Sequence, residues 1–389
     1  MKSSGIGGQA VMEGIMMRNG EKYAVGVRLP DQEIFVKVDE YTAPSRRPAI
    51  TRAPFIRGVF NFVDSLYIGM KTLTYSASFY EEDEPKKDEK KAENSAEAVV
   101  EAVEAKVVAE EEAKAADEVA EATDAVTTVE APKPPVLKDE PKKDGSMSST
   151  TWLAVALSIV ISVGLFMVLP VFLGNLVAKA TNSSFWVAFA EGMIRLAIFI
   201  AYVGLISLMS DIKRVYMYHG AEHKCINCVE HGLPLSVDNV RKSSRFHKRC
   251  GTSFLLIVMM ISIVLFMVIR VRTLWLRVLS RILLLPVIAG ISYEFLRLAG
   301  NSDNAIVSLL SKPGLALQRL TTREPDDSMI EVGIASVEAV FSWKKYLNEN
   351  FSMNYDLSET EAVAGAAEVA ESVEAETIKT DSELPEEES

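Results

Sequence analysis

The chain has 389 residues and a formal net charge of −12, with 49% hydrophobic and 24% charged residues. The acidic charge is concentrated in residues 81–144, with 21 acids and 10 lysines, and in residues 356–389, with 12 acids and one lysine. The rest of the chain holds 30 bases and 20 acids, which excludes an acidic core and favours anionic lipid headgroups as neighbours. Both acidic segments lack the apolar side chains needed to fold, so we predict disordered acidic segments at 81–149 and 351–389.

The sequence also argues against a secreted protein stabilised by disulfides. The start of the chain, MKSSGIGGQAVMEG, has no long apolar run of the kind found in cleaved signal peptides. The chain has three cysteines and four histidines, and reduced thiols beside histidines indicate metal or redox chemistry in the cytosol. We therefore expect an intracellular site of that kind.

Residues 1–50 predict a small β unit on the cytosolic side. Asn19-Gly20 stands between two apolar runs, which is a strong hairpin signal. Tyr23, Val25 and Val27 alternate onto one face, and IFVKVDE alternates again after a turn. A three-stranded meander is the simplest interpretation, and it is too small to be stable without the rest of the protein.

Residues 51–80 predict one helix, from Phe55 to Tyr75, that is apolar on most sides. Arg57, Asp64 and Lys71 recur at seven-residue spacing and so share one polar stripe. Three charges in about 20 residues argue against a membrane span. We expect this helix to lie in the membrane interface or to dock against the membrane helices.

Four apolar runs are each long enough to cross a hydrocarbon core of about 30 Å. They predict two transmembrane hairpins, at 150–210 and 253–300, and the runs are Trp152–Val177, Phe185–Met209, Phe254–Val271 and Leu274–Leu298. Charges inside these runs should face the bundle interior, and they are Glu191, Arg195 and Glu294. One feature argues against this layout: four arginines would lie near the outer connection of the second hairpin, namely Arg270, Arg272, Arg277 and Arg281. An interfacial or re-entrant helix in place of one of these two runs is the alternative to four spans.

The orientation of the spans follows from the distribution of basic residues. Residues 211–252 carry eight Lys and Arg residues, whereas the loop after the first span carries Lys179 alone. The positive-inside rule therefore predicts a multi-pass protein of the cell membrane, with both termini and residues 211–252 in the cytosol. Its basic cytosolic face suits a protein or ribosomal partner, whereas RNA binding would need more aromatic residues. Residues 301–350 predict a turn-rich connector and an amphipathic docking helix.

Three of the four histidines and two of the three cysteines lie in HGAEHKCINCVEHG, residues 219–232. We expect the second span to continue as one helix to about Glu230, since proline does not interrupt it. On a helical wheel, His219, Glu222, His223 and Glu230 share one face, and the two cysteines, Cys225 and Cys228, lie on the other.

This face predicts a metal site. His219 and His223, at i and i+4, can bind one ion, and Glu230 or His247 can complete three protein ligands. HGAEH matches H-x-x-E-H, a zinc peptidase motif whose glutamate acts as a general base, which gives that role to Glu222. His247 and Cys250 suit a second ligand pair and a packed loop equally well.

The two remaining cysteines have a structural and a chemical interpretation. Cys225 and Cys228 on one helix face are typical of buried packing residues. They would form half of a zinc ribbon only if the helix broke there, with His231 or Cys250 completing the ligand set.

Several motifs in order carry a family resemblance: GGQAVMEGIMMR, RGVFNFVDSLYIGMKTL, YHGAEHKCINCVEHG, RFHKRCGTSFL and PGLALQRLTTREPDD. The chain resembles the YqhQ-like family of bacterial multi-pass membrane proteins (domain of unknown function 1385), whose members are predicted metal-dependent enzymes. The resemblance covers residues 5–80 and 150–345. It implies functional roles for His219, Glu222, His223, His247, Arg249 and Cys250, and none for the cysteines of HKCINC.

The sequence thus predicts a mainly α fold, a polytopic membrane helix bundle with an N-terminal β meander. The leading hypothesis is a cytosol-facing, zinc-dependent hydrolase in the membrane. A non-enzymatic scaffold or assembly factor, clamped by a metal with four protein ligands, is the alternative. A transporter using the intramembrane charges is a third hypothesis, weakened because no inverted repeat is evident.

Overall fold

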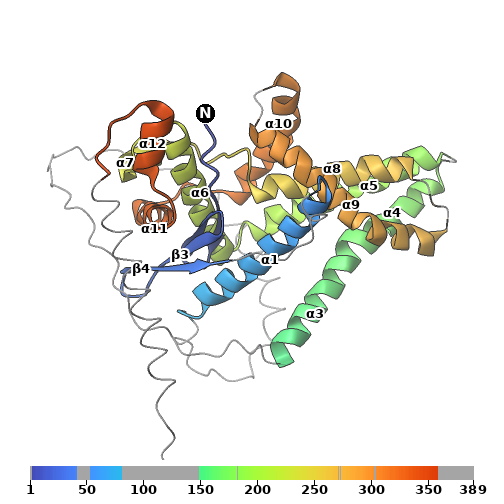
Figure 1. Cartoon of the computed structure of the whole chain (residues 1–389). Coiled ribbons are helices and arrows are strands. Elements are labelled where there is room, and N and C mark those ends of the chain that lie inside the picture. Colours follow the sequence, from blue (N-terminus) through green and yellow to red (C-terminus); the bar gives the residue numbers. More distant parts are fainter. Residues whose placement is uncertain are drawn as a thin grey trace, which may run out of the picture.

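The computed structural model describes residues 2–41, 53–80, 149–181, 183–269, 271, 273–301 and 304–357. It contains an N-terminal antiparallel sheet and a mainly helical remainder, as predicted (Figure 1). Most of the two segments predicted as disordered, 81–149 and 351–389, lies outside the described residues.

The N-terminal sheet has four strands in the order β1-β2-β3-β4, one more than the predicted meander. The strands are β1 (Gly7–Val11), β2 (Gly14–Asn19), β3 (Lys22–Arg28) and β4 (Ile34–Glu40). The turn predicted at Asn19-Gly20 is confirmed, because Asn19 pairs with Lys22 across it. Sequence reasoning missed β1 because Gly7 and Gly8 have no side chains to show a period of two.

Helices cover both faces of the sheet (Figure 1). On one face Tyr23, Val25 and Val27 pack with Ile68 of helix α1 (Ile56–Ala77), which confirms their predicted alternation. On the other face Ile15 and Met17 pack against α6 (Ser210–Glu230) and α11 (Asp327–Glu338). The sheet is therefore built into the protein core, as its small size requires.

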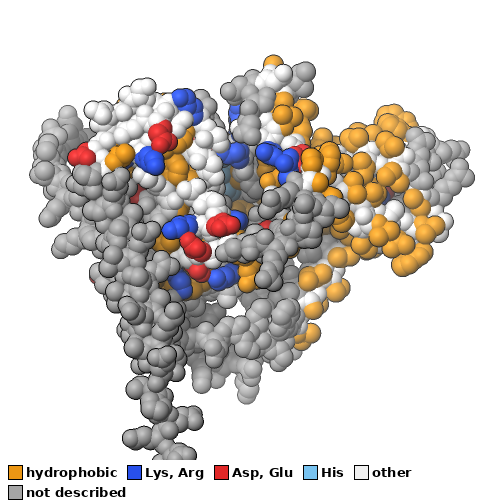
Figure 2. All heavy atoms as spheres, in the orientation of Figure 1, with side chains coloured by type: hydrophobic (Ala, Val, Ile, Leu, Met, Phe, Trp, Pro, Cys, Tyr) orange, Lys and Arg blue, Asp and Glu red, His pale blue; other side chains and the backbone are white. Residues whose placement is uncertain are grey.

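Four helical segments are long and apolar enough to cross a membrane, as the sequence predicts. Their candidate spans are Ala156–Ala178, Phe185–Ile206, Gly251–Val268 and Leu279–Gly300. The first runs through α3 (Ser149–Val163), a π-helical turn (Gly164–Val168) and α4 (Leu169–Ala178); the others lie in α5 (Ser184–Ile206), α8 (Gly251–Val268) and α9 (Leu274–Asn301). Figure 2 shows the hydrophobic surface of this region, which contrasts with the charged side chains around the sheet.

Several charges inside the spans are buried in the bundle, whereas Glu294, which was also predicted to face inward, is half-buried and pairs with Arg57 of α1. Glu191 and Arg195 are 2% and 7% exposed, which confirms the prediction that they face inward. Arg281 was expected at the outer connection, but it is 5% exposed and forms an ion pair with Glu191. A buried carboxylate explains this difference, because an arginine at membrane depth requires one. Arg270 and Arg272 lie outside the described residues.

Two predicted continuous helices are interrupted. The second span was expected to run on to Glu230, but α5 ends at Ile206 and α6 starts at Ser210 after an extended Met209. Hydroxyl and carboxylate side chains near this junction favour a helix start, since they compete with helical hydrogen bonds. The segment 301–350 folds as three helices rather than a connector and one helix: α10 (Ala305–Thr321), α11 and α12 (Trp343–Phe351).

Candidate metal centre

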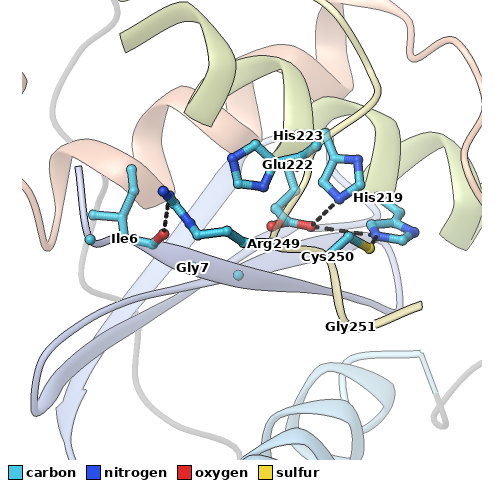
Figure 3. Close-up of a pocket in the computed structure, with 11 residues that line it drawn as sticks. Ile6, Gly7, His219, Glu222, His223, Arg249, Cys250 and Gly251 are labelled. Atoms are coloured by element: carbon cyan, nitrogen blue, oxygen red, sulfur yellow. Dashed lines mark hydrogen bonds and ion pairs between the residues drawn. The ribbon is translucent and has the colours of Figure 1, made fainter. Parts of the chain in front are cut away.

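A polar pocket of about 220 Å³ lies between α6, the start of α8 and the segment that leads into β1 (Figure 3). Helix α6 contributes His219, Glu222 and His223 to its walls. Its other lining residues are Gly5, Ile6, Gly7, Gly8, His247, Arg249, Cys250 and Gly251. Three distant parts of the sequence therefore meet at the face of α6 that the helical wheel singled out.

Three of these residues direct metal-ligand atoms toward one another. One ligand atom from each of His219, His223 and Cys250 fits within a mutual separation of 4.8 Å. The His219 Nε2 atom lies 3.2 Å from the Cys250 Sγ atom (Figure 3). Two imidazoles and a thiol at this spacing form a set that could hold one metal ion.

The opposite ring nitrogen of each histidine is held by a backbone carbonyl. His219 Nδ1 lies 2.8 Å from the Thr321 oxygen, and His223 Nδ1 lies 2.7 Å from the Arg245 oxygen. A carbonyl oxygen only accepts, so in each case Nδ1 donates the hydrogen, and Nε2 is the nitrogen left to bind a metal ion once it carries no proton. Metal-binding histidines in proteins are typically oriented by such a bond.

The charges around Cys250 favour its thiolate. Burial opposes ionisation, but the neighbouring His219 and His223 outweigh it and hold the pKa of the Cys250 thiol well below its usual value. Burial likewise disfavours a charged His219, but Cys250 raises the pKa of His219 to about 9. Cys250 also caps α8, where its Sγ atom accepts a hydrogen bond from the Thr252 amide at 3.4 Å. The thiolate is the form of cysteine that binds metals.

Glu222 faces the same centre. Its Oε2 atom lies 3.8 Å from His219 Nε2 and 3.9 Å from His223 Nε2 (Figure 3). Gly8 passes directly beneath it, and a Cβ atom there would come within 2.8 Å of Glu222 Cγ. The side chain is 5% exposed, so the close backbone of β1 limits where the carboxylate can move.

Glu230 has a different set of neighbours. Its Oε1 atom accepts hydrogen bonds from the Ser4 amide at 2.7 Å and from Arg249, and Oε2 lies 3.4 Å from His247 Nε2. Burial opposes ionisation of Glu230, but His247, Ser4 and Arg249 outweigh it and lower its pKa to about 2. Glu230 thus forms the centre of a buried charge cluster with His247 and Arg249.

Of the residues predicted for the site, His219, Glu222, His223, His247 and Cys250 line the pocket, whereas Glu230 is not among its lining residues. The wheel places Glu230 on the correct face but ignores helix rise. Eleven residues separate it from His219, which amounts to about 16 Å along the axis. The carbonyls of Thr321 and Arg245 carry no sequence signal, because any residue can supply a backbone oxygen.

The loop that carries His247 and Cys250 is fixed to α6 by buried polar side chains. Lys224 donates to the carbonyl oxygens of Arg241 and Ser243 at 2.8 and 2.9 Å. Asn227 donates to those of Ser244 and Phe246 at 2.6 and 3.0 Å. These bonds satisfy the loop's backbone and place Cys250 opposite the two histidines.

Cys225 and Cys228 belong to the hydrophobic core behind the site. Both are 0% exposed, and burial raises the pKa of each thiol. They lie on the side of α6 that packs against β2 and α11, as the helical wheel predicts. This surrounding favours their interpretation as packing residues.

Comparisons with known proteins identify the family. A family described as Protein of unknown function (DUF1385) matches residues 53–343. The uncharacterized protein YqhQ of Bacillus subtilis is 32% identical over 348 residues, which cover 88% of this chain and 94% of YqhQ. No solved structure matches the chain. The chain therefore belongs to the DUF1385 family.

Proposed function

We propose that this DUF1385 protein is a membrane-embedded, zinc-dependent hydrolase whose site faces the cytosol. His219, His223 and Cys250 would hold the metal, and Glu222 would act as general base. The observation that carries the proposal is the orientation of the two histidines. Both commit Nδ1 to a backbone carbonyl and turn Nε2 toward the centre that Cys250 also faces.

The donor set favours zinc. Two imidazole nitrogens and one thiolate match the ligands of catalytic zinc sites, which keep a fourth position for water or substrate. The pocket of about 220 Å³ leaves room for both. When bound, zinc supplies Lewis-acid chemistry that makes water reactive near neutral pH.

The roles of the protein groups follow from their distances. Glu222 Oε2 lies less than 4 Å from both Nε2 atoms, so a water molecule at the centre would be within reach of it. The close Gly8 backbone and the packing of α6 hold the carboxylate there. Glu222 would accept the proton at Oε2, while Arg249 and His247 stay paired with Glu230 at the edge of the pocket.

The proposed orientation places the site and both termini in the cytosol. The eight basic residues between Asp211 and Thr252 support it through the positive-inside rule. The site lies at the membrane boundary, because Gly251 both lines the pocket and begins a candidate span.

Metal analysis of the purified protein tests the ligand set. We expect stoichiometric zinc in the parent chain and in Cys225→Ala, and its loss in His219→Ala and Cys250→Ala. Zinc loss in Cys225→Ala alone would contradict the proposal. Retention of zinc in His219→Ala would also contradict it.

Glu222→Gln tests the hydrolase. The zinc-loaded parent chain should hydrolyse at least one of a set of peptide, ester and phosphoester reporter substrates, whereas the variant should keep zinc and lose turnover. If the variant loses zinc instead, Glu222 is a ligand. A site closed by four protein ligands, whose chelation unfolds the protein, would support the scaffold alternative.

The contact between Cys250 and His219 favours a second candidate function without a metal. Their Sγ and Nε2 atoms lie 3.2 Å apart, and the Thr321 carbonyl orients the imidazole, as in nucleophile–base pairs. The Cys250 thiolate would then attack a substrate carbonyl to form a thioester, the protonated His219 would give its proton to the leaving group, and water would hydrolyse the thioester to regenerate the thiolate. Turnover that survives complete removal of metal, and is lost in Cys250→Ser, would favour this candidate over the zinc hydrolase.

A further inference from the structure

Helix α1 has its side chains distributed in the reverse of a water-facing helix. Seven large apolar residues on it are exposed by 37–59%: Ile56, Phe60, Val63, Leu66, Tyr67, Met70 and Leu73. Its buried residues are mostly small or polar: Gly58, Asp64, Ile68, Gly69, Thr72 and Ser76. A helix beside water buries its apolar stripe and exposes its polar face. The outer face of α1 therefore matches an apolar surrounding.

Each charged residue of α1 contacts a polar side chain elsewhere in the same chain. Arg57 donates from Nε to Glu294 of α9 at 2.7 Å. Asp64 accepts a hydrogen bond from the Tyr41 hydroxyl at 3.0 Å, and Lys71 pairs with Asp39 at 2.9 Å. The stripe that argued against membrane insertion in the sequence is thus paired within the protein. The ion pairs of Arg57 and Lys71 and the hydrogen bond to Asp64 lower the cost of placing this helix in lipid.

The N-terminal end of α1 packs against the middle of a candidate span, in α9 (Figure 1). A Cβ atom on Gly58 would lie 2.7 Å from Tyr293 Cβ, and one on Gly290 would lie 2.6 Å from the Phe55 oxygen. Gly290 stands ten residues inside the end of the span Leu279–Gly300, or about 15 Å along the helix. This is about half of a hydrocarbon core of 30 Å.

The C-terminal end of α1 lies at the sheet instead. The Ser76 hydroxyl accepts a hydrogen bond from the Met12 amide at 3.0 Å, and Tyr75 and Phe79 pack against the sheet's apolar face. One end of the helix is therefore beside the middle of a span and the other is beside the sheet and the pocket segment.

We propose that α1 is a fifth membrane-embedded helix, with its N-terminal end near the middle of the bilayer and its C-terminal end at the membrane surface beside the sheet. Acyl chains cover its exposed apolar stripe, because α1 packs against the candidate span in α9, which itself exposes large apolar side chains. The polar sheet and the candidate metal centre then lie at the level of the lipid headgroups on the same side. This inference stands independently of the proposed hydrolase.

Spin labels on single introduced cysteines test the depth of α1 in the intact protein, reconstituted in bilayers. The labelled positions are Val63→Cys and Met70→Cys, with Lys22→Cys as the aqueous reference and Val264→Cys on α8 as the lipid reference. The native cysteines are buried, and the parent chain treated with label supplies the background. Collisions are measured with oxygen, which enters lipid, and with a water-soluble nickel complex.

We expect the label at Val63 to collide with oxygen and to be shielded from nickel as strongly as the label at Val264. The label at Met70, nearer the sheet, should show a smaller oxygen-to-nickel ratio than Val63. Nickel access at Val63 equal to that at Lys22 would place α1 in water and overturn the proposal. Shielding from both reagents would show that a protein segment, rather than lipid, covers the stripe, and would overturn it as well.

Discussion

Helix α6 carries two buried carboxylates on one side, and their surroundings differ. Glu230 accepts hydrogen bonds from Ser4 and Arg249 and lies beside His247. Glu222, two turns earlier, faces the Nε2 atoms of His219 and His223 at distances too long for direct hydrogen bonds. Both side chains are almost fully buried, at 0% and 5% exposed.

The difference agrees with a structural role for Glu230 and with the proposed chemical role of Glu222. A buried charge is tolerated when every lone pair has a partner, and Glu230 meets that condition by linking the N-terminal segment to the loop before α8. Glu222 retains acceptor capacity toward a pocket, which is costly for stability and useful for chemistry. Sequence alone treats the two residues alike, since both lie on one face of the same helix.

Glu230→Ala should have the largest effect on stability. The substitution leaves Arg249 and His247 without their carboxylate in a buried place, so we expect a loss of about 3 kcal/mol in the free energy of unfolding. Chemical denaturation in detergent measures it. Glu331→Ala, which removes the exposed partner of Arg28, is the matched control and should cost less than about 1 kcal/mol. Equal losses of unfolding free energy in the two variants would show that the buried contacts of Glu230 stabilise the protein no more than the exposed pair of Glu331.

His223→Ala should have its main effect on metal affinity. Because His223 is a proposed ligand, its loss should weaken zinc binding by more than the roughly 10–100-fold that loss of an orienting partner costs. Competition with a chromophoric chelator measures this change. His231→Ala is the control, because His231 caps the end of α6 outside the pocket and contacts the Asn227 carbonyl. Zinc affinity lowered equally in both variants would place the metal elsewhere.

Gly8→Ala should have an intermediate effect, because β1 passes close beneath Glu222. A Cβ atom at Gly8 would meet Glu222 Cγ, the Met16 oxygen and Met17 Sδ at 2.8–2.9 Å. We expect a loss of about 1–3 kcal/mol in stability together with reduced turnover. Gly7→Ala, with no atom within 4 Å of the new Cβ, should change stability by less than about 0.5 kcal/mol. Thermal unfolding of the two variants makes the comparison.

Much of the fold could be predicted from the sequence, because it depends on local patterns. The four spans follow from apolar length, and the strands around Asn19-Gly20 follow from alternation and turn chemistry. The break between α5 and α6 and the inward position of Arg281 could not be predicted in the same way. Both depend on tertiary partners, such as Glu191, which no local pattern identifies.

The part of the candidate site that depends on local sequence could also be predicted, whereas the part that depends on tertiary contacts could not. His219, Glu222 and His223 are four residues apart or fewer, so helix periodicity alone brings them together. Cys250 joins them only because Lys224 and Asn227 hold its loop, a tertiary contact that the sequence does not encode as a motif. Glu230 was wrongly placed in the metal site, because a helical wheel shows the angle of a residue around the axis and not its distance along the axis.

Glu222→Gln should change stability less than Glu230→Ala or Gly8→Ala. Among the described residues, no hydrogen-bond donor lies within bonding distance of the Glu222 carboxylate, and the two Nε2 atoms stand at 3.8 and 3.9 Å from it. An amide of the same shape therefore breaks no close contact, and we expect the free energy of unfolding to change by less than about 1 kcal/mol. Denaturation of this variant beside Glu230→Gln measures the contrast directly. A loss in Glu222→Gln as large as that in Glu230→Gln would show that both carboxylates are structural, and the general-base role of Glu222 would lose its support.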